Sequence, residues 1–366
     1  RASASMKPGA FLLLGVKRRG SGCELMGSNV PAHGPCHEFP RQWRRLDRVK
    51  TARKRSALRA AIAAALLSSF SLAAYAYLPT KAKLEDTVVE VITEPAVKQP
   101  ISNGPTNTER RTMQIGGRER EYLVSTPSDV HQLIGLPLIM VFHGYRMDVN
   151  KMRATTNFDS AHAVVVYMQG IDTAWAPAPY AKTTGEEDLA FFDAVREQML
   201  REYPVNPARV FAAGHSNGGG FAAYAACHRP HVLTGIATVS AAYYEKVFEG
   251  CSPAPVKQID FHGTGDRVIR YEGGWRYNTP YEPMGRVLID AERRNHCHPQ
   301  PLAEDFVRPG QKLTWQDCDA PLVHYRLEGS AHVWPGGLID HGPGSIGTKN
   351  FATNEILDFF RIPRRG

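Results

Sequence analysis

Cysteine is scarce in this sequence, with six residues among 366, and the four that follow residue 200 do not have the two-to-four-residue spacing of zinc ligands. A zinc site is therefore not expected. We also expect no other metal site and no cofactor. Glycine and proline occur at ordinary levels, and no internal repeat or low-complexity run follows the first eighty residues, which excludes a collagen-like or repeat protein. Hydrophobic residues make up 43% of the chain, which excludes wholesale disorder.

Excess positive charge is also lacking over most of the chain. Residues 1–60 carry 14 Lys and Arg against three acidic residues, a net charge of +11. The remaining residues carry 30 basic and 33 acidic side chains, a net charge of −3. Because the basic balance belongs to the N-terminal part alone, we do not expect a nucleic-acid partner.

One long uncharged apolar run, residues 60–79, follows a cluster of basic residues. Ala74-Tyr75-Ala76 within it has the small-x-small pattern that signal peptidases accept, so residues 49–76 are predicted to be a signal peptide of a secreted or periplasmic protein. The alternative is a membrane anchor, because roughly 20 apolar residues can span a bilayer. Contact with a membrane is expected only if this segment is not cleaved.

The segments on either side of the apolar run lack a clear pattern. Residues 1–48 are basic and irregular, and we expect a disordered extension there; a translation start near Val49 is one hypothesis. Residues 77–112 are polar and punctuated by proline, which is typical of a linker. A single catalytic domain is then expected over residues 113–366.

Strand and helix patterns alternate through this domain, which predicts an α/β fold with a mostly parallel sheet covered by helices on both faces. The expected strands are Glu121–Ser125, Leu136–His143, Ala163–Gln169, Arg209–Ala213, Gly235–Ser240, Val256–His262 and Leu322–Leu327. The expected helices are Glu186–Tyr203, one directly after Ser216, Met284–Arg294 and Asn354–Arg361.

The strongest local motif is Gly214-His215-Ser216-Asn217-Gly218, between a predicted strand and a predicted helix. This arrangement is typical of a nucleophile elbow, in which the serine Oγ is exposed on a tight turn. The flanking glycines are expected because a Cβ there would collide with neighbouring backbone. A glycine-rich turn without chemistry is the alternative interpretation.

A serine nucleophile needs a base and an orienting acid, which follow the serine in the order acid, then histidine, in this fold class. Asp266 follows the strand that ends at His262, and His332 follows the strand that ends at Leu327. We therefore predict a Ser216, Asp266 and His332 triad. Asp260 and Glu272 are the alternative acids, and Asp260 is expected to be structural because it lies within a strand.

Two backbone N–H groups are expected to form an oxyanion hole. One belongs to Asn217, directly after the serine, and the other to Tyr145, in the turn that follows His143-Gly144 at the end of a strand. A plain strand-ending turn is the alternative for His143-Gly144.

The motifs FHGY, AGHSNGGGFAAYAA, HGTGD followed by YEGG, and AHVWPGG occur in this order between about residues 117 and 360. In combination they resemble the polyhydroxybutyrate depolymerase and feruloyl esterase group of secreted α/β-hydrolases. The resemblance implies hydrolysis of an ester in a polyester, or of a phenolic or acetyl ester on a polysaccharide. Residues 175–188 depart from the family forms of the loop that faces the substrate, so the natural ester stays open.

The four later cysteines are predicted to form two disulfides, with buried free thiols as the alternative. Pairing of neighbours would close loops of about 25 and about 22 residues, each worth roughly 3 kcal/mol. The four positions resemble the cysteine positions of the family, which supports the pairs Cys227–Cys251 and Cys297–Cys318.

Two tryptophans, Trp175 and Trp334, are expected to contact the substrate, with Trp334 favoured because it lies two residues after the predicted base. Tyr145 and Trp275 are further candidates, and ordinary packing is the alternative for all four. The predicted function is an exported serine esterase. A serine peptidase of the same fold and a catalytically silent binding protein are the alternatives.

Overall fold

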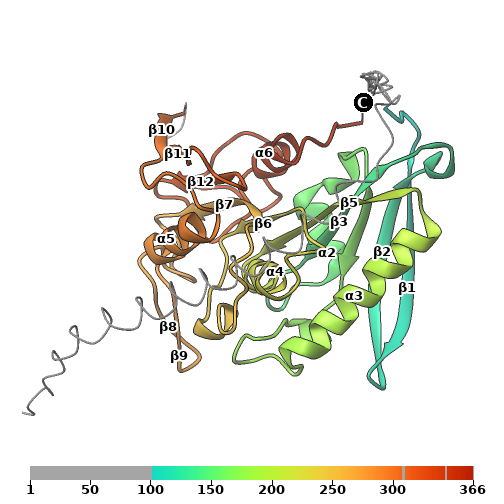
Figure 1. The fold of residues 1–366 in the computed structure, drawn as a ribbon, viewed down its shortest axis with the longest axis horizontal. Helices are drawn as coiled ribbons and strands as arrows, with labels where there is room; N and C mark the ends of the chain where they lie inside the picture. The colour runs from blue at the N-terminus through green and yellow to red at the C-terminus, as the bar shows by residue number, and fades with distance from the viewer. Residues whose placement is uncertain (1–100, 307–309, 343, 366) are drawn as a thin grey trace, which may run out of the picture. The chain divides into compact units, whose positions relative to one another are not determined.

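A ten-stranded sheet runs through the part of the chain that the computed structural model describes, which is residues 101–366 without 307–309, 343 and 366 (Figure 1). The predicted extension at 1–48 and the predicted signal peptide lie outside these residues. The strands of the sheet are β1 (Thr106–Ile115), β2 (Arg118–Pro127), β3 (Leu136–Phe142), β4 (Val164–Met168), β5 (Val205–His215), β6 (Gly235–Val239), β7 (Lys257–Gly263), β10 (Leu302–Asp305), β11 (Gly310–Thr314) and β12 (Leu322–Leu327). The remaining elements are the hairpin β8 (Gly274–Arg276) and β9 (Thr279–Tyr281), and the helices α2 (Val149–Thr156), α3 (Gly185–Glu202), α4 (Asn217–His228), α5 (Met284–Arg294) and α6 (Phe351–Phe359).

The strand order is β1-β2-β4-β3-β5-β6-β7-β12-β11-β10. The six central strands, from β4 to β12, pair in parallel, and the outer strands pair antiparallel. In a parallel sheet all carboxyl ends meet at one edge, and loops from different strands can share a site there. The predicted mostly parallel sheet is confirmed.

The two faces of the sheet support two hydrophobic cores. Along β3, Leu138, Met140 and Phe142 pack into one core, and Ile139 and Val141 pack into the other. This alternation follows from the two-residue period of a strand, and both sets of side chains are fully buried. Helices α3, α4 and α5 contribute to the first core, and α2 and α6 contribute to the second. The expected covering by helices on both faces is therefore confirmed.

The predicted linker ends too late at residue 112, because β1 begins at Thr106 and pairs along its whole length with β2. Most side chains of β1 are exposed or half-buried, so the strand has the polar composition of a linker. Its order comes from backbone hydrogen bonds to β2, which leave little mark on the sequence.

Several other elements were not predicted. Helix α2 has only eight residues, and its N-terminus is capped by the side chain of Asp148, which accepts a hydrogen bond from the Lys151 N–H. Strands β10 and β11 are short and lie at the edge of the sheet with exposed or half-buried side chains. Such elements carry little hydrophobic periodicity.

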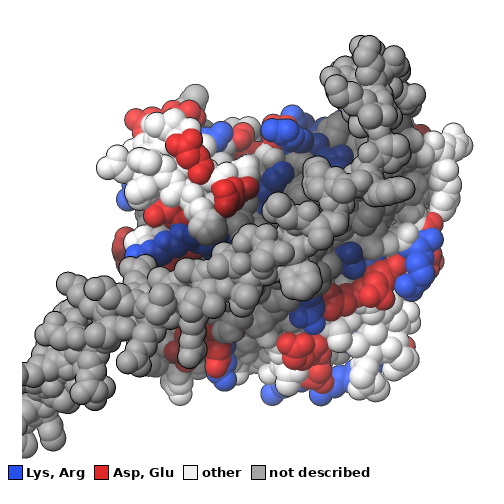
Figure 2. Space-filling model, viewed as in Figure 1, with Lys and Arg blue, Asp and Glu red and all other residues white. Residues whose placement is uncertain are grey.

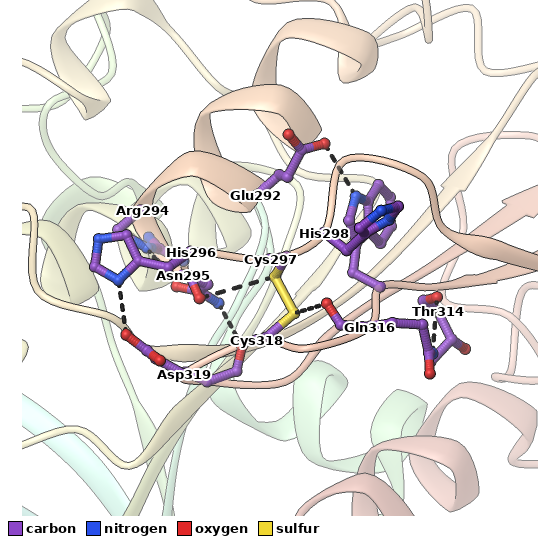
Figure 3. The surroundings of a disulfide bond; sticks show 12 residues. Glu292, Arg294, Asn295, His296, Cys297, His298, Thr314, Gln316, Cys318 and Asp319 are labelled. Carbon is purple, nitrogen blue, oxygen red and sulfur yellow. Dashed lines mark hydrogen bonds and ion pairs between the residues drawn. A yellow bond between two sulfur atoms is a disulfide. The ribbon is translucent and has the colours of Figure 1, made fainter.

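Two disulfides, Cys227–Cys251 and Cys297–Cys318, are present, and the predicted pairing is confirmed. The second disulfide fastens the chain just after α5 to the segment before β12 (Figure 3). Beside it, His296 Nδ1 lies 2.7 Å from a carboxylate oxygen of Asp319.

Acidic and basic side chains are interspersed on the face shown in Figure 2, where grey atoms leave the surface visible. Within residues 101–366, no helix has the length and apolar character needed to cross a bilayer. The predicted apolar segment is not part of this range.

Candidate active site

Ser216 occupies a strained turn between β5 and α4. Its backbone has φ 54° and ψ −118°, a conformation that a non-glycine residue adopts only when the surrounding structure enforces it. A Cβ added at Gly214 would lie 2.1 Å from the Gly218 carbonyl oxygen, and one at Gly218 would lie 2.2 Å from the Phe142 carbonyl oxygen. The two glycines therefore allow β5, α4 and β3 to approach closely enough to form the turn, as predicted.

The three residues of the predicted triad form one line of hydrogen bonds. His332 Nδ1 lies 2.7 Å from Asp266 Oδ2, and His332 Nε2 lies 2.8 Å from Ser216 Oγ. An ionised carboxylate only accepts, so Nδ1 carries the proton and Nε2 accepts from the serine hydroxyl. The side chains come from the loops after β5, β7 and β12, at the carboxyl edge of the sheet.

Asp266 is the acid that meets His332, and neither alternative acid does. Its Oδ1 accepts hydrogen bonds from the N–H groups of Val268 and Ile269. Burial opposes ionisation, but hydrogen bonds from neighbouring histidines outweigh it, and the pKa of Asp266 lies well below its usual range. Asp260 is fully buried in β7 and accepts from Thr238, Tyr243 and His324, while Glu272 is exposed. The expectation that Asp260 is structural agrees with this network.

His215, the residue before the serine, is a buried neighbour of the site that sequence reasoning did not single out. Its ring lies 5.1 Å from the His332 ring, and burial lowers the pKa of His215 to about 3. It is therefore neutral at ordinary pH and adds no positive charge beside His332.

The turn after β3 lies against Ser216. A Cβ added at Gly144 would lie 3.2 Å from His215 Nδ1 and 3.3 Å from the Ser216 Cβ, so any larger residue would press on the serine turn. His143 fixes the turn, because its Nδ1 donates to the Gly144 carbonyl oxygen and its Nε2 accepts from the Gly170 N–H. Burial lowers the pKa of His143 to about 4, which keeps the ring neutral and the two bonds in place.

Asn217, the first residue of α4, has a backbone N–H without a partner inside the helix. Its side chain forms two hydrogen bonds to the backbone of Trp175, which the sequence did not indicate. Asn217 Oδ1 accepts from the Trp175 N–H, and Asn217 Nδ2 donates to the Trp175 carbonyl oxygen. The residue after the serine therefore also fastens the loop that starts at Trp175.

The expectation that Trp175 and Trp334 contact the substrate is wrong for this structure, because both side chains are fully buried. The Trp175 ring stacks on Phe221 and meets Phe142 edge-on. Trp334 Nε1 donates to Thr353 Oγ1, and its ring packs against Phe158. Both are core residues that support the loops of the site.

Four tyrosines form a group that includes Tyr145, the residue after Gly144, and only Tyr145 was a candidate from the sequence. The Tyr145 and Tyr180 rings stack with centroids 4.1 Å apart, and the Tyr180 ring meets Tyr277 at 4.8 Å and Tyr244 at 6.0 Å. We refer to these four residues as the tyrosine cluster. They come from four separate segments, so no local pattern marks them.

A cavity of about 430 Å³ adjoins this cluster. Tyr244 lines it together with residues 176–179 and 183–185, which belong to the loop expected to face the substrate. Two backbone hydrogen bonds connect Tyr244 to the serine turn. The Tyr244 N–H donates to the Ala242 carbonyl oxygen, and the Ala242 N–H donates to the Ser216 carbonyl oxygen. Trp275, another candidate from the sequence, is 74% exposed on β8.

The mostly parallel sheet, the helices on both faces and the serine turn after β5 define an α/β-hydrolase fold. No protein-family model matches the chain. Feruloyl esterase D from Neurospora crassa is 26% identical over 302 residues, which cover 75% of this chain and 93% of that protein. Feruloyl esterase C from Emericella nidulans is 32% identical over 180 residues, 48% of this chain and 59% of that protein.

A third relative, the bifunctional acetylxylan esterase/xylanase XynS20E from Neocallimastix patriciarum, is 26% identical over 225 residues. These cover 59% of this chain and 31% of that protein. By sequence, the chain is thus related to carboxylic ester hydrolases of the feruloyl esterase group, and the predicted resemblance is confirmed.

Proposed function

We propose that the protein is an exported serine esterase that cleaves carboxylic esters through an acyl-enzyme. The observation that carries this proposal is the continuous line of hydrogen bonds from Ser216 through His332 to Asp266, with lengths of 2.8 and 2.7 Å. A serine hydroxyl bonded to the unprotonated nitrogen of an oriented imidazole is the arrangement that nucleophilic catalysis requires.

In the first half of the reaction, Ser216 Oγ attacks the ester carbonyl carbon while His332 Nε2 takes the hydroxyl proton. The tetrahedral intermediate then expels the alcohol, which receives this proton from His332 and leaves the acyl group on Ser216. In the second half, His332 takes a proton from water, whose oxygen attacks the acyl carbon. The carboxylic acid departs, and the proton returns to Ser216. Asp266 stays ionised throughout and stabilises the imidazolium.

The negative oxygen of each tetrahedral intermediate is stabilised by the backbone N–H groups of Asn217 and Tyr145. The close contact of Gly144 with Ser216 supports this role for the turn after β3. The start of α4 adds the positive end of a helix dipole at Asn217.

The substrate is a phenolic or acetyl ester attached to polysaccharide, with a polyhydroxyalkanoate-type polyester as the other ester of this class. The names of the relatives support the first group. The tyrosine cluster supplies aromatic surface for a phenolic acyl group, and the 430 Å³ cavity beside it, which Tyr244 lines, is large enough to hold such a group. Two disulfides support export to an oxidising compartment.

A substrate panel tests this proposal. We expect turnover of a feruloyl ester, an aryl acetate and a short hydroxybutyrate oligomer to be lost in Ser216→Ala, and we expect no turnover of the matching amides. Amide cleavage at a comparable rate would favour a peptidase. Absence of turnover on every ester, together with no reaction with an organophosphate, would favour a silent binding protein.

A further inference from the structure

Asp266 faces two histidines, and only one of them belongs to the predicted triad. His332 Nδ1 approaches Oδ2 at 2.7 Å, and His262 Nε2 lies 3.5 Å from the same oxygen. The other oxygen, Oδ1, accepts from the N–H groups of Val268 and Ile269. Oδ2 therefore faces both histidines, and Oδ1 is held by the two backbone N–H groups.

His262 stands near the end of β7, and its side chain is 1% exposed. Its Nε2 lies 2.8 Å from the Ile269 carbonyl oxygen. A carbonyl oxygen only accepts, so Nε2 carries a proton and donates it to Ile269, and the same nitrogen lies 3.5 Å from Asp266 Oδ2. His262 Nδ1 has no hydrogen-bond partner among the residues that the structure describes.

We infer that His262 is a positioning residue for the acid of the triad, a role that rests on the proposed function. Its hydrogen bond to the Ile269 carbonyl oxygen holds the turn of residues 266–269 in place. Its Nε2–H, 3.5 Å from Asp266 Oδ2, partly offsets the negative charge of the carboxylate. The carboxylate is thereby kept in the orientation that bonds His332. Its electrostatic attraction for the protonated His332 ring is also weaker than it would be without His262. The His262 ring beside the carboxylate also contributes to the low pKa of Asp266.

Few other groups near His262 titrate. The Tyr271 ring lies 5.8 Å from the His262 ring, edge-on, and Asp260 is on the same strand with its charge bonded to His324. His215 is neutral for the reason given above. Asp266 is therefore the ionised group that a change at His262 affects most directly.

The test compares two variants that differ by one methylene group. His262→Gln places an amide N–H near the position of Nε2, whereas the amide of His262→Asn stands near Nδ1 and is too short to reach Asp266 or Ile269. We expect kcat/KM on an aryl ester to fall about 10-fold in His262→Asn, the size of effect typical when a residue that orients a functional side chain is lost. In His262→Gln we expect it to be largely restored.

The pH dependence separates positioning from mere structural support. In His262→Asn, Asp266 has more charge available for the His332 imidazolium, so the inactive protonated form persists to higher pH. We expect the acid limb of kcat/KM to move up by roughly half a pH unit. The low-field proton resonance of the His332–Asp266 hydrogen bond is expected to shift in the same variant, a readout that needs no turnover.

His324→Gln is the matched control, because His324 is equally buried on the neighbouring strand and bonds Asp260 instead. It should lower the melting temperature without moving the acid limb or the low-field resonance. An unshifted limb and resonance in folded His262→Asn, or no difference between His262→Asn and His262→Gln, would overturn the inference. Lack of esterase activity in the wild-type protein would instead refute the proposed function, and the resonance would still test His262.

Discussion

Replacing Asp188 with asparagine should destabilise the protein strongly. Asp188 is fully buried, and it accepts a hydrogen bond from Arg120 Nη2 at 2.9 Å, where the Arg120 side chain is 2% exposed. Asp188→Asn would leave the Arg120 cation buried without an opposite charge, which costs about 3–5 kcal/mol. For a domain of roughly 260 residues the unfolding entropy is about 0.55 kcal/mol/K, so the melting temperature should fall by about 5–9 °C.

The substitution should also affect catalysis, because Asp188 Oδ2 accepts from the Ala176 N–H and from Thr183 Oγ1, both in the loop beside the cavity. An amide in place of the carboxylate weakens these bonds, and we expect KM for an aryl ester to rise more than kcat falls.

Urea and thermal unfolding followed by circular dichroism measure the stability change. Arg120→Met combined with Asp188→Asn removes both charges and should regain more than half of the lost stability. The exposed pair Arg286–Asp290 is the control, since Asp290→Asn should cost less than about 1 kcal/mol. A loss below 1 kcal/mol in Asp188→Asn, or a double variant as unstable as the single one, would refute the reasoning.

Three further results are expected. Asp266→Asn should lower kcat about 10⁴-fold by favouring the wrong imidazole tautomer, while Glu272→Gln stays near wild type; comparable losses in both would contradict the assignment of the acid. Because the pKa of Asp266 is depressed, the stability that it adds is present above about pH 4 and is lost as the pH falls toward the folded-state value, so urea midpoints should drop from pH 5 to pH 2 more in wild type than in Asp266→Asn. Replacing either cysteine pair with serine should cost about 3 kcal/mol in thermal unfolding, and peptide mapping without reductant should recover the two pairs seen in the structure.

The central strands and long helices could be predicted from the sequence because their signals are local. Helix α5 and strand β12 have the predicted bounds, Met284–Arg294 and Leu322–Leu327. Continuous apolar runs mark strands that are buried on both faces, and the 3.6-residue period marks helices. Ser216, Asp266 and His332 could also be predicted from the sequence, because each follows a strand that ends at the same edge of the sheet.

Contacts between distant segments could not be predicted in this way. Trp334 was expected to contact the substrate because it lies two residues after His332, and Trp175 because it begins the loop expected to face the substrate. Both side chains are fully buried instead. The tyrosine cluster and the approach of His262 to Asp266 depend on how loops fold over the sheet edge. The edge strand β1 has polar side chains and is defined by its pairing with β2, which the composition does not reveal.

The central claim is that Ser216 is the nucleophile, and reaction with an organophosphate tests it most directly. Mass spectrometry of the inactivated protein should find one phosphoryl group per chain, located on Ser216. Ser216→Ala should take up no label and lose on the order of 10⁶ in kcat. Label on another residue, or a folded Ser216→Ala variant that keeps more than a few per cent of the activity, would contradict the account.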